Sequence, residues 1–135
     1  MKGSMMNILV AYNGTDEAKA ALDLAKDYAN IHDAVVHIIT SMEGGSREKL
    51  KAITQSKKDL EYALELMKTN GITCEGYQTV RGLSPGEDII RYAEEYNIKH
   101  IFVGIEKKSR TRKLLLGSTA QYIILKASCP VTTIH

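Results

Sequence analysis

Short apolar runs alternate along this chain with longer amphipathic segments, and no other feature restricts the possible folds as strongly. Buried parallel strands read as continuous apolar runs, and each pair needs a crossover helix between its members. The alternation therefore predicts an α/β fold, an open five-stranded parallel sheet with helices on both faces. Strands are expected over 7–12, 34–40, 72–80, 99–104 and 131–134, and helices over 15–32, 47–68, 84–96 and 118–129.

Local signals mark where two of the helices begin. The segment 84–87, Ser-Pro-Gly-Glu, combines a capping residue, a proline suited to the first helical position and a glutamate placed to complete a capping box. Ser118 and Gln121 have the same spacing and predict a second capping box. The spacing also predicts buried stripes, formed by Ile89, Ile90, Ala93 and Tyr96 in the third helix and by Ala120, Ile123, Ile124 and Ala127 in the last.

Chain length and composition limit the class of protein. A chain of 135 residues suffices for one domain with one core, expected over 7–135, while residues 1–6 are expected to be a tag remnant or a disordered start. Hydrophobic residues make up 44% and charged residues 25%, which excludes disordered and fibrous architectures. No apolar run approaches the roughly 18 residues of a membrane span, and the start lacks the apolar core of a signal peptide. We therefore expect a cytoplasmic protein without membrane contact.

One segment concentrates positive charge, although the formal net charge of the whole chain is only +2. Residues 106–113 contain one acid, Glu106, and five basic residues, which are Lys107, Lys108, Arg110, Arg112 and Lys113. Such a segment is either a solvated loop or an anion site. In open α/β sheets, ligands bind beyond the carboxyl ends of the strands where the strand order reverses. The loops after the first and fourth strands, which hold Asn13 and the basic segment, are thus the candidate ligand site.

The basic segment lies inside a recognisable motif. From Gly104 to Thr119 the sequence resembles the nucleotide-binding loop of the universal stress protein family, written G-x2-G-x9-G-[S/T]. Gly104, Gly117 and Ser118 agree with this pattern, and Lys107 stands where the family has its middle glycine. The segments 8–15, 81–82 and 129–131 also resemble the family's opening strand and turn, its glycine after the third strand and its Pro-Val before the last strand.

The resemblance implies a Rossmann-like sheet of strand order 3-2-1-4-5 and a stress-response factor that binds an adenine nucleotide, ATP or AMP, as a sensor or adaptor. It implies a homodimer formed through the last strand, Val131–Ile134, whose edge would offer unpaired backbone groups to a second copy. The residues that it assigns to the nucleotide are Ala11, Tyr12, Asn13, Ser41, Val103, Gly104, Lys107, Gly117, Ser118 and Thr119. For the last three there is also a physical reason, because a helix N-terminus leaves backbone N–H groups unpaired and carries a partial positive charge suited to phosphate.

Two residues depart from the family pattern. Lys107 has a side chain where a glycine would let the backbone N–H point at phosphate, although its ammonium group could make a charge-assisted contact instead. Asn13 stands where an aspartate is typical after the first strand. The chain therefore lacks at that position the negative charge that could bind a pair of ribose hydroxyls or support a metal ion. No metal site is predicted, and magnesium is disfavoured.

Other function classes have less support. No GxSxG, HExxH or Walker motif occurs, so no catalysis is expected beyond, at most, slow ATP hydrolysis, and the histidines are scattered at His32, His37, His100 and His135. A phosphorelay receiver would need acidic residues after the first and third strands, where Asn13 and Arg81-Gly82 stand. The alternative that stays open is a dimeric interaction module that binds no nucleotide, whose basic loop binds another anion or an acidic partner. Nucleic acid is not an expected partner.

Overall fold

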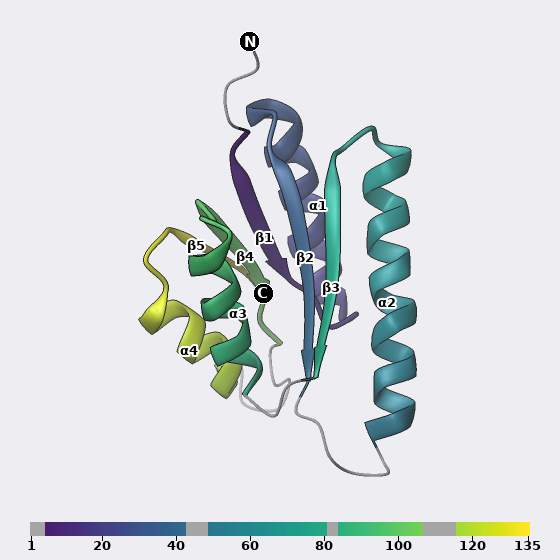
Figure 1. The fold of residues 1–135 in the computed structure, drawn as a ribbon, viewed down its shortest axis with the longest axis vertical. Helices are drawn as coiled ribbons and strands as arrows, with labels where there is room; N and C mark the ends of the chain where they lie inside the picture. The colour runs from purple at the N-terminus through teal and green to yellow at the C-terminus, as the bar shows by residue number, and fades with distance from the viewer. Residues whose placement is uncertain (1–4, 43–48, 81–83, 107–115) are drawn as a thin grey trace.

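The computed structural model describes residues 5–42, 49–80, 84–106 and 116–135 (Figure 1). The strands are β1 (Asn7–Ala11), β2 (Val35–Met42), β3 (Cys74–Val80), β4 (His100–Gly104) and β5 (Val131–Ile134). The helices are α1 (Asp16–His32), α2 (Lys49–Thr69), α3 (Pro85–Glu95) and α4 (Ser118–Lys126). Strands and helices alternate as the apolar runs predict. Within the described ranges, no helix combines the length and apolar character needed to cross a membrane.

The sheet is parallel throughout, and its strand order is β3-β2-β1-β4-β5. This confirms the predicted α/β fold and the order implied by the family resemblance. The order reverses at β1, because the chain adds β2 and β3 on one side of this strand and then crosses back to add β4 and β5 on the other. Ala11 pairs with Val103, which brings the carboxyl ends of β1 and β4 side by side. A ligand site is expected at such a position.

Helices cover both faces of the sheet, α1 and α2 on one and α3 and α4 on the other (Figure 1). Alternate residues of a strand point to opposite faces. On β1, Ile8 and Val10 pack in the core cluster that includes α1 and α2, whereas Leu9 packs in the cluster that includes α3 and α4. Because both faces of the central strands are buried, these strands read as continuous apolar runs instead of alternating patterns.

One histidine is part of this core. His37 on β2 is only 4% exposed, and its Nε2 lies 3.1 Å from Asn7 Oδ1 while its Nδ1 lies 2.6 Å from the Tyr92 hydroxyl. The Asn7 oxygen can only accept, so Nε2 carries the proton and Nδ1 accepts from the Tyr92 O–H. Burial lowers the pKa of His37, and the nearby Glu75 carboxylate opposes this effect. The neutral ring has both of its nitrogens hydrogen-bonded.

Both α3 and α4 start where the sequence predicts, but the residue that caps α4 is not the predicted one. Ser84 is the N-cap of α3, and its hydroxyl accepts a hydrogen bond from the Glu87 backbone N–H at 3.4 Å. In α4 the N-cap is Gly117, so Ser118 is already the first helical residue, and the capping role predicted for Ser118 is wrong. The physical reason is that the Gln121 backbone N–H bonds to the Gly117 carbonyl at 3.0 Å, which starts the first turn one residue earlier.

Two side chains of the predicted stripes are more exposed than the spacing suggests. Ile124 is 40% exposed and Tyr96 is 38% exposed. A helix turns by about 100° per residue, so α4, which packs through Ala120 and Ile123, carries Ile124 outward. Tyr96 is the C-cap of α3, and its ring stacks on Tyr92 with ring centroids 4.2 Å apart. The spacing predicted the correct face of each helix but overestimated its width.

Candidate functional site

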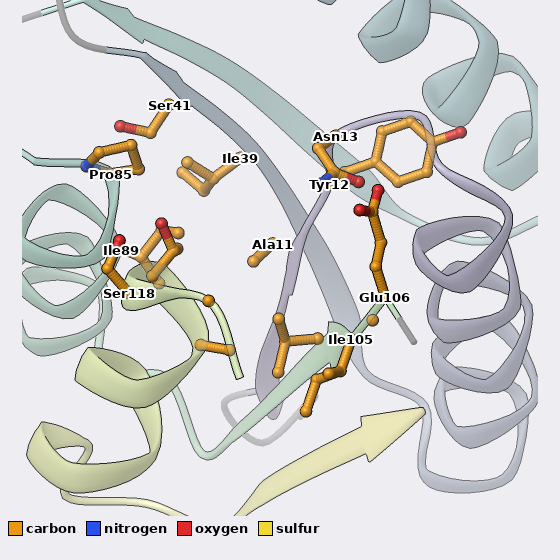
Figure 2. Close-up of a pocket in the computed structure, with 15 residues that line it drawn as sticks. Ala11, Tyr12, Asn13, Ile39, Ser41, Pro85, Ile89, Ile105, Glu106 and Ser118 are labelled. Carbon is orange, nitrogen blue, oxygen red and sulfur yellow. The ribbon is translucent and has the colours of Figure 1, made fainter. Parts of the chain in front are cut away.

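A pocket of about 430 Å³ opens at the carboxyl ends of β1 and β4, beside the first residues of α4 (Figure 2). Its volume lies in the range of small-molecule sites, about 300–1,000 Å³. Nine of the ten residues that the family resemblance assigns to a nucleotide line this pocket, namely Ala11, Tyr12, Asn13, Ser41, Val103, Gly104, Gly117, Ser118 and Thr119. The tenth, Lys107, lies outside the described residues, as do the other basic residues of the segment.

Six further lining residues were not among the predicted ones: Ile39, Pro85, Ile89, Ile105, Glu106 and Ala120. All of them except Glu106 are apolar, and together with Ala11 and Val103 they form the floor of the pocket. Ile39 and Ile89 are 1% and 3% exposed, so they support this floor from inside the core. Such a surface suits the flat apolar face of a ring. No sequence signal distinguishes Ile39 and Ile89 from other core positions on β2 and α3, whereas Ile105 and Glu106 lie inside the glycine motif.

The N-terminus of α4 forms the polar side of the pocket. Gly117 is the N-cap in an extended conformation, and no side chain caps the helix. The backbone N–H groups of the first turn are therefore left for a ligand, and the helix dipole favours an anion at this place. Because the Ser118 hydroxyl does not cap the helix, it is also available. Gly117 and Ser118 are exposed and Thr119 is half-buried, so a ligand can reach all three.

The two glycines of the motif differ in what surrounds them. A Cβ added to Gly104 would lie 2.4 Å from the Glu17 carbonyl carbon and 2.5 Å from the Ala18 backbone nitrogen. Gly104 therefore lets the first turn of α1 pack directly on the end of β4. A Cβ added to Gly117 would meet nothing within 4 Å. The first glycine has a packing role that the motif did not indicate, whereas the space around the second is open.

Tyr12 contributes its backbone more than its side chain to the pocket. Its backbone N–H donates to the Ile39 carbonyl at 2.9 Å and so continues the pairing of β1 and β2. The ring is 3% exposed and belongs to the core cluster that includes α1 and α2. Burial, and then the nearby Tyr62 and Asp59, raises the pKa of Tyr12 to about 12. Its hydroxyl is thus neutral at physiological pH.

Asn13 organises the turn between β1 and α1. Its Oδ1 accepts hydrogen bonds from the Thr15 backbone N–H at 3.3 Å and from the Thr15 hydroxyl at 2.8 Å. The Thr15 hydroxyl in turn accepts from the Ala18 N–H at 3.1 Å and caps α1. Gly14, between them, has a φ of +78°, which only glycine adopts without strain. The side-chain oxygen of Asn13 is therefore engaged by the protein itself.

A buried carboxylate supports the wall of the pocket. Asp88, in the first turn of α3, is 1% exposed and accepts hydrogen bonds from the Ser41 hydroxyl at 2.6 Å and the Thr79 hydroxyl at 3.2 Å. These bonds tie α3 to the carboxyl ends of β2 and β3. Asp88 was not among the predicted site residues, and its only sequence signal is an acid in the first turn of a helix. It fixes the orientation of Ser41 at the pocket.

Glu106 extends along the opposite wall. Figure 2 shows its carboxylate on the side where Asn13 lies and across the pocket from Ser118. It is the only carboxylate among the described residues that line the pocket. In the described part of the chain, no three histidine, cysteine, aspartate or glutamate side chains gather closely enough to hold a metal ion.

The fold and the pocket define the class: an open, doubly wound α/β protein with a pocket where the strand order reverses. A family model described as the universal stress protein family matches residues 5–135. The chain belongs to the universal stress protein family, which confirms the resemblance seen in its glycine motif.

Individual relatives agree with this assignment. A protein of Thermus aquaticus named "Universal stress protein in QAH/OAS sulfhydrylase 3'region" is 30% identical over 136 aligned residues, covering 95% of this chain and 97% of that one. The structure of a universal stress protein from Archaeoglobus fulgidus is 33% identical with a TM-score of 0.87, over 98% of this chain and all of the other. The universal stress protein from Archaeoglobus fulgidus in complex with dAMP is 30% identical with a TM-score of 0.78, over 98% of both chains.

Proposed function

We propose that this protein binds an adenine nucleotide, AMP or ATP, in the pocket at the ends of β1 and β4, and that it acts as a nucleotide-responsive stress factor. The observation that carries the proposal is the combination, in one pocket, of an apolar floor and an uncapped helix N-terminus. A 30% identical relative whose structure contains dAMP, a nucleotide with the same base and phosphate as AMP, supports it. Membership of the universal stress protein family supports the role in stress response.

The two sides of the pocket suggest how the nucleotide lies. The adenine ring would pack on the apolar floor near Ala11 and Val103, because burial of its faces there removes apolar surface from water. The phosphate would bind at the start of α4, where the N–H groups of Ser118 and Thr119 and the helix dipole favour an anion. The ribose would then lie between them, near the end of β1.

Magnesium is not part of the proposed site. Mg²⁺ is held in proteins by oxygen ligands, usually one or two carboxylates together with phosphates and water. Of the described residues that line the pocket, Glu106 alone supplies a carboxylate, and Figure 2 shows it across the pocket from Ser118, so it is not placed to hold a cation together with the phosphate. We therefore expect the affinity for AMP to be the same with and without magnesium.

Calorimetric titration with AMP, ATP and cyclic AMP tests the proposal, after mass spectrometry has checked the purified protein for a bound nucleotide. We expect a dissociation constant in the micromolar range, which corresponds to about −8 kcal/mol. If folded and empty protein binds none of the three, the nucleotide proposal is wrong. The interaction module that binds another anion or an acidic partner then becomes the leading function.

The variant Gly117→Asp tests the location of the phosphate. It places a carboxylate at the N-terminus of α4, and a Cβ at this position meets nothing within 4 Å, so the fold should be retained. Repulsion between like charges should abolish measurable affinity for AMP. Gly117→Asn, of nearly the same size but uncharged, is the matched control and should keep more of the affinity. Unchanged AMP affinity in Gly117→Asp would exclude this site.

A homodimer through β5 and a cytoplasmic location complete the proposal. β5 is an edge strand of the sheet, and all four of its residues are partly exposed. An edge strand presents unpaired N–H and C=O groups that a second copy can pair with. Sedimentation equilibrium should give twice the chain mass of 15.0 kDa. A mass of one chain at micromolar concentration would contradict the dimer without affecting the nucleotide site.

A further inference from the structure

A ribose bound in the pocket would need hydrogen-bond acceptors for its hydroxyl groups. A ribose presents two adjacent hydroxyl groups, and each needs a hydrogen-bond acceptor when it is buried by a protein. Asn13, at the end of β1, is the first candidate by position. Its Oδ1, however, already accepts two hydrogen bonds from Thr15. The Thr15 N–H can bond only to the oxygen of the amide, so the amide cannot be turned around, and the other group of the Asn13 amide, its NH2, only donates.

Glu106 supplies the missing acceptor. Its carboxylate lies on the Asn13 side of the pocket in Figure 2, near the end of β1 where the ribose of a bound nucleotide would lie. An ionised carboxylate has two oxygens that only accept, and it can take one hydrogen bond from each of two neighbouring hydroxyls. We propose that Glu106 binds the ribose hydroxyls and makes the pocket selective for ribonucleotides over 2′-deoxyribonucleotides. This inference rests on the proposed function, because it concerns the sugar of the same ligand.

The charges of the pocket agree with this division of roles. The carboxylate of Glu106 and the N-terminus of α4 lie on opposite sides, as Glu106 and Ser118 show in Figure 2. A negative charge near the helix N-terminus would repel the phosphate, whereas on the Asn13 side it faces the sugar. The neighbouring Asn13 is neutral, so no second carboxylate competes with Glu106 for the same hydroxyls. A neutral Asn13 and an ionised Glu106 are therefore compatible with one ribose site in which Glu106 is the acceptor.

The experiment compares adenosine with 2′-deoxyadenosine and AMP with dAMP by calorimetry, in the wild-type protein and in Glu106→Gln. The two nucleosides carry no phosphate, so they separate ribose binding from repulsion between Glu106 and phosphate. Glu95→Gln is the matched control, because this glutamate is exposed at the far end of α3 and does not line the pocket. Thermal unfolding of all three proteins checks that the substitutions leave the fold intact.

We expect the wild type to prefer the ribo form about tenfold, and Glu106→Gln to lose most of this preference through weaker binding of adenosine and AMP. Glu95→Gln should keep the wild-type ratio. A ratio that is the same in Glu106→Gln and wild type overturns the role of Glu106 while leaving nucleotide binding established. Tighter AMP binding by Glu106→Gln, without a change in adenosine affinity, also overturns it, since Glu106 would then only repel phosphate. If no nucleoside or nucleotide binds, the proposed function itself fails, and this inference fails with it.

Discussion

Gly104→Ala is predicted to destabilise the fold, because this glycine lets α1 approach the end of β4. The added Cβ would lie 2.4 Å from the Glu17 carbonyl carbon, whereas ordinary contacts begin at 3.4 Å, so the first turn of α1 would have to move by about 1 Å. The obstructing atoms belong to the backbone and cannot rotate away. Overpacking of this kind costs about 1–3 kcal/mol, and a rigid obstacle places the cost near the upper value.

The expected net loss follows from a second, opposing effect. Alanine is favoured over glycine within a strand by roughly 0.5–1 kcal/mol, because glycine loses more backbone entropy on folding. The free energy of unfolding of Gly104→Ala should therefore be about 2 kcal/mol lower than that of the wild type. For a domain of this size the melting temperature should fall by roughly 6–8 °C.

Urea unfolding followed by far-ultraviolet circular dichroism measures this difference, provided that both proteins unfold in one transition with the same m-value. Gly117→Ser is the matched control, since a Cβ at 117 meets nothing within 4 Å and serine is a favoured N-cap. Its stability should be equal to or slightly above that of the wild type. An unchanged unfolding midpoint in Gly104→Ala would refute the packing argument. Loss of AMP affinity at full stability would show instead that Gly104 serves the ligand.

Two further predictions concern pH and a helix cap. Because burial lowers the pKa of His37 below its unfolded value of about 6.5, the unfolded chain binds more protons in acid, so stability is complete above about pH 6.5 and falls as the pH decreases below it. Burial lowers the pKa of His100 as well, so in His37→Gln the loss of stability between about pH 7 and pH 5 should be smaller than in the wild type but still present. Urea unfolding at about pH 7, 6 and 5 measures this loss. A loss equal to that of the wild type would contradict the contribution of His37. Ser84→Ala removes the side-chain cap of α3 and should lower the free energy of unfolding by about 1 kcal/mol. In the same urea assay Ser84→Thr, which keeps a hydroxyl, should retain most of the wild-type free energy of unfolding. A decrease as large as that of Ser84→Ala would argue against the cap.

Most of the secondary structure was predictable, because its signals are local. The continuous apolar runs became β1 to β5, and Ser84 caps α3 as its sequence context predicts. Two predictions that rested on local spacing in α4 were wrong. Ser118 has the spacing of a capping residue but lies one position inside α4, and Ile124 continues a stripe on a side of the helix that is 40% exposed. Both outcomes depend on how α4 meets its neighbours, which no local pattern contains.

The residues that line the pocket were also largely predictable, because the glycine motif and the end of the first strand fall where parallel strands meet. Nine of the assigned residues line one pocket, while Lys107 lies outside the described residues. Their individual chemistry was less predictable. Asp88 holds Ser41 from 47 positions further along the chain, and the apolar floor uses core residues of β2 and α3. Contacts over such separations have no counterpart in the spacing of residues.

The sequence by itself determined the kinds of elements, their order along the chain and the end of the sheet where the pocket lies, because hydrophobic period, capping chemistry and turn residues act over a few positions. Only the tertiary structure decided which group each polar atom meets. In the folded chain the Asn13 oxygen accepts hydrogen bonds from Thr15, and Gly104 packs against the backbone of α1. Glu106 lines the pocket. A hydrogen bond or a close contact depends on distances of a few tenths of an ångström between segments that folding alone brings together.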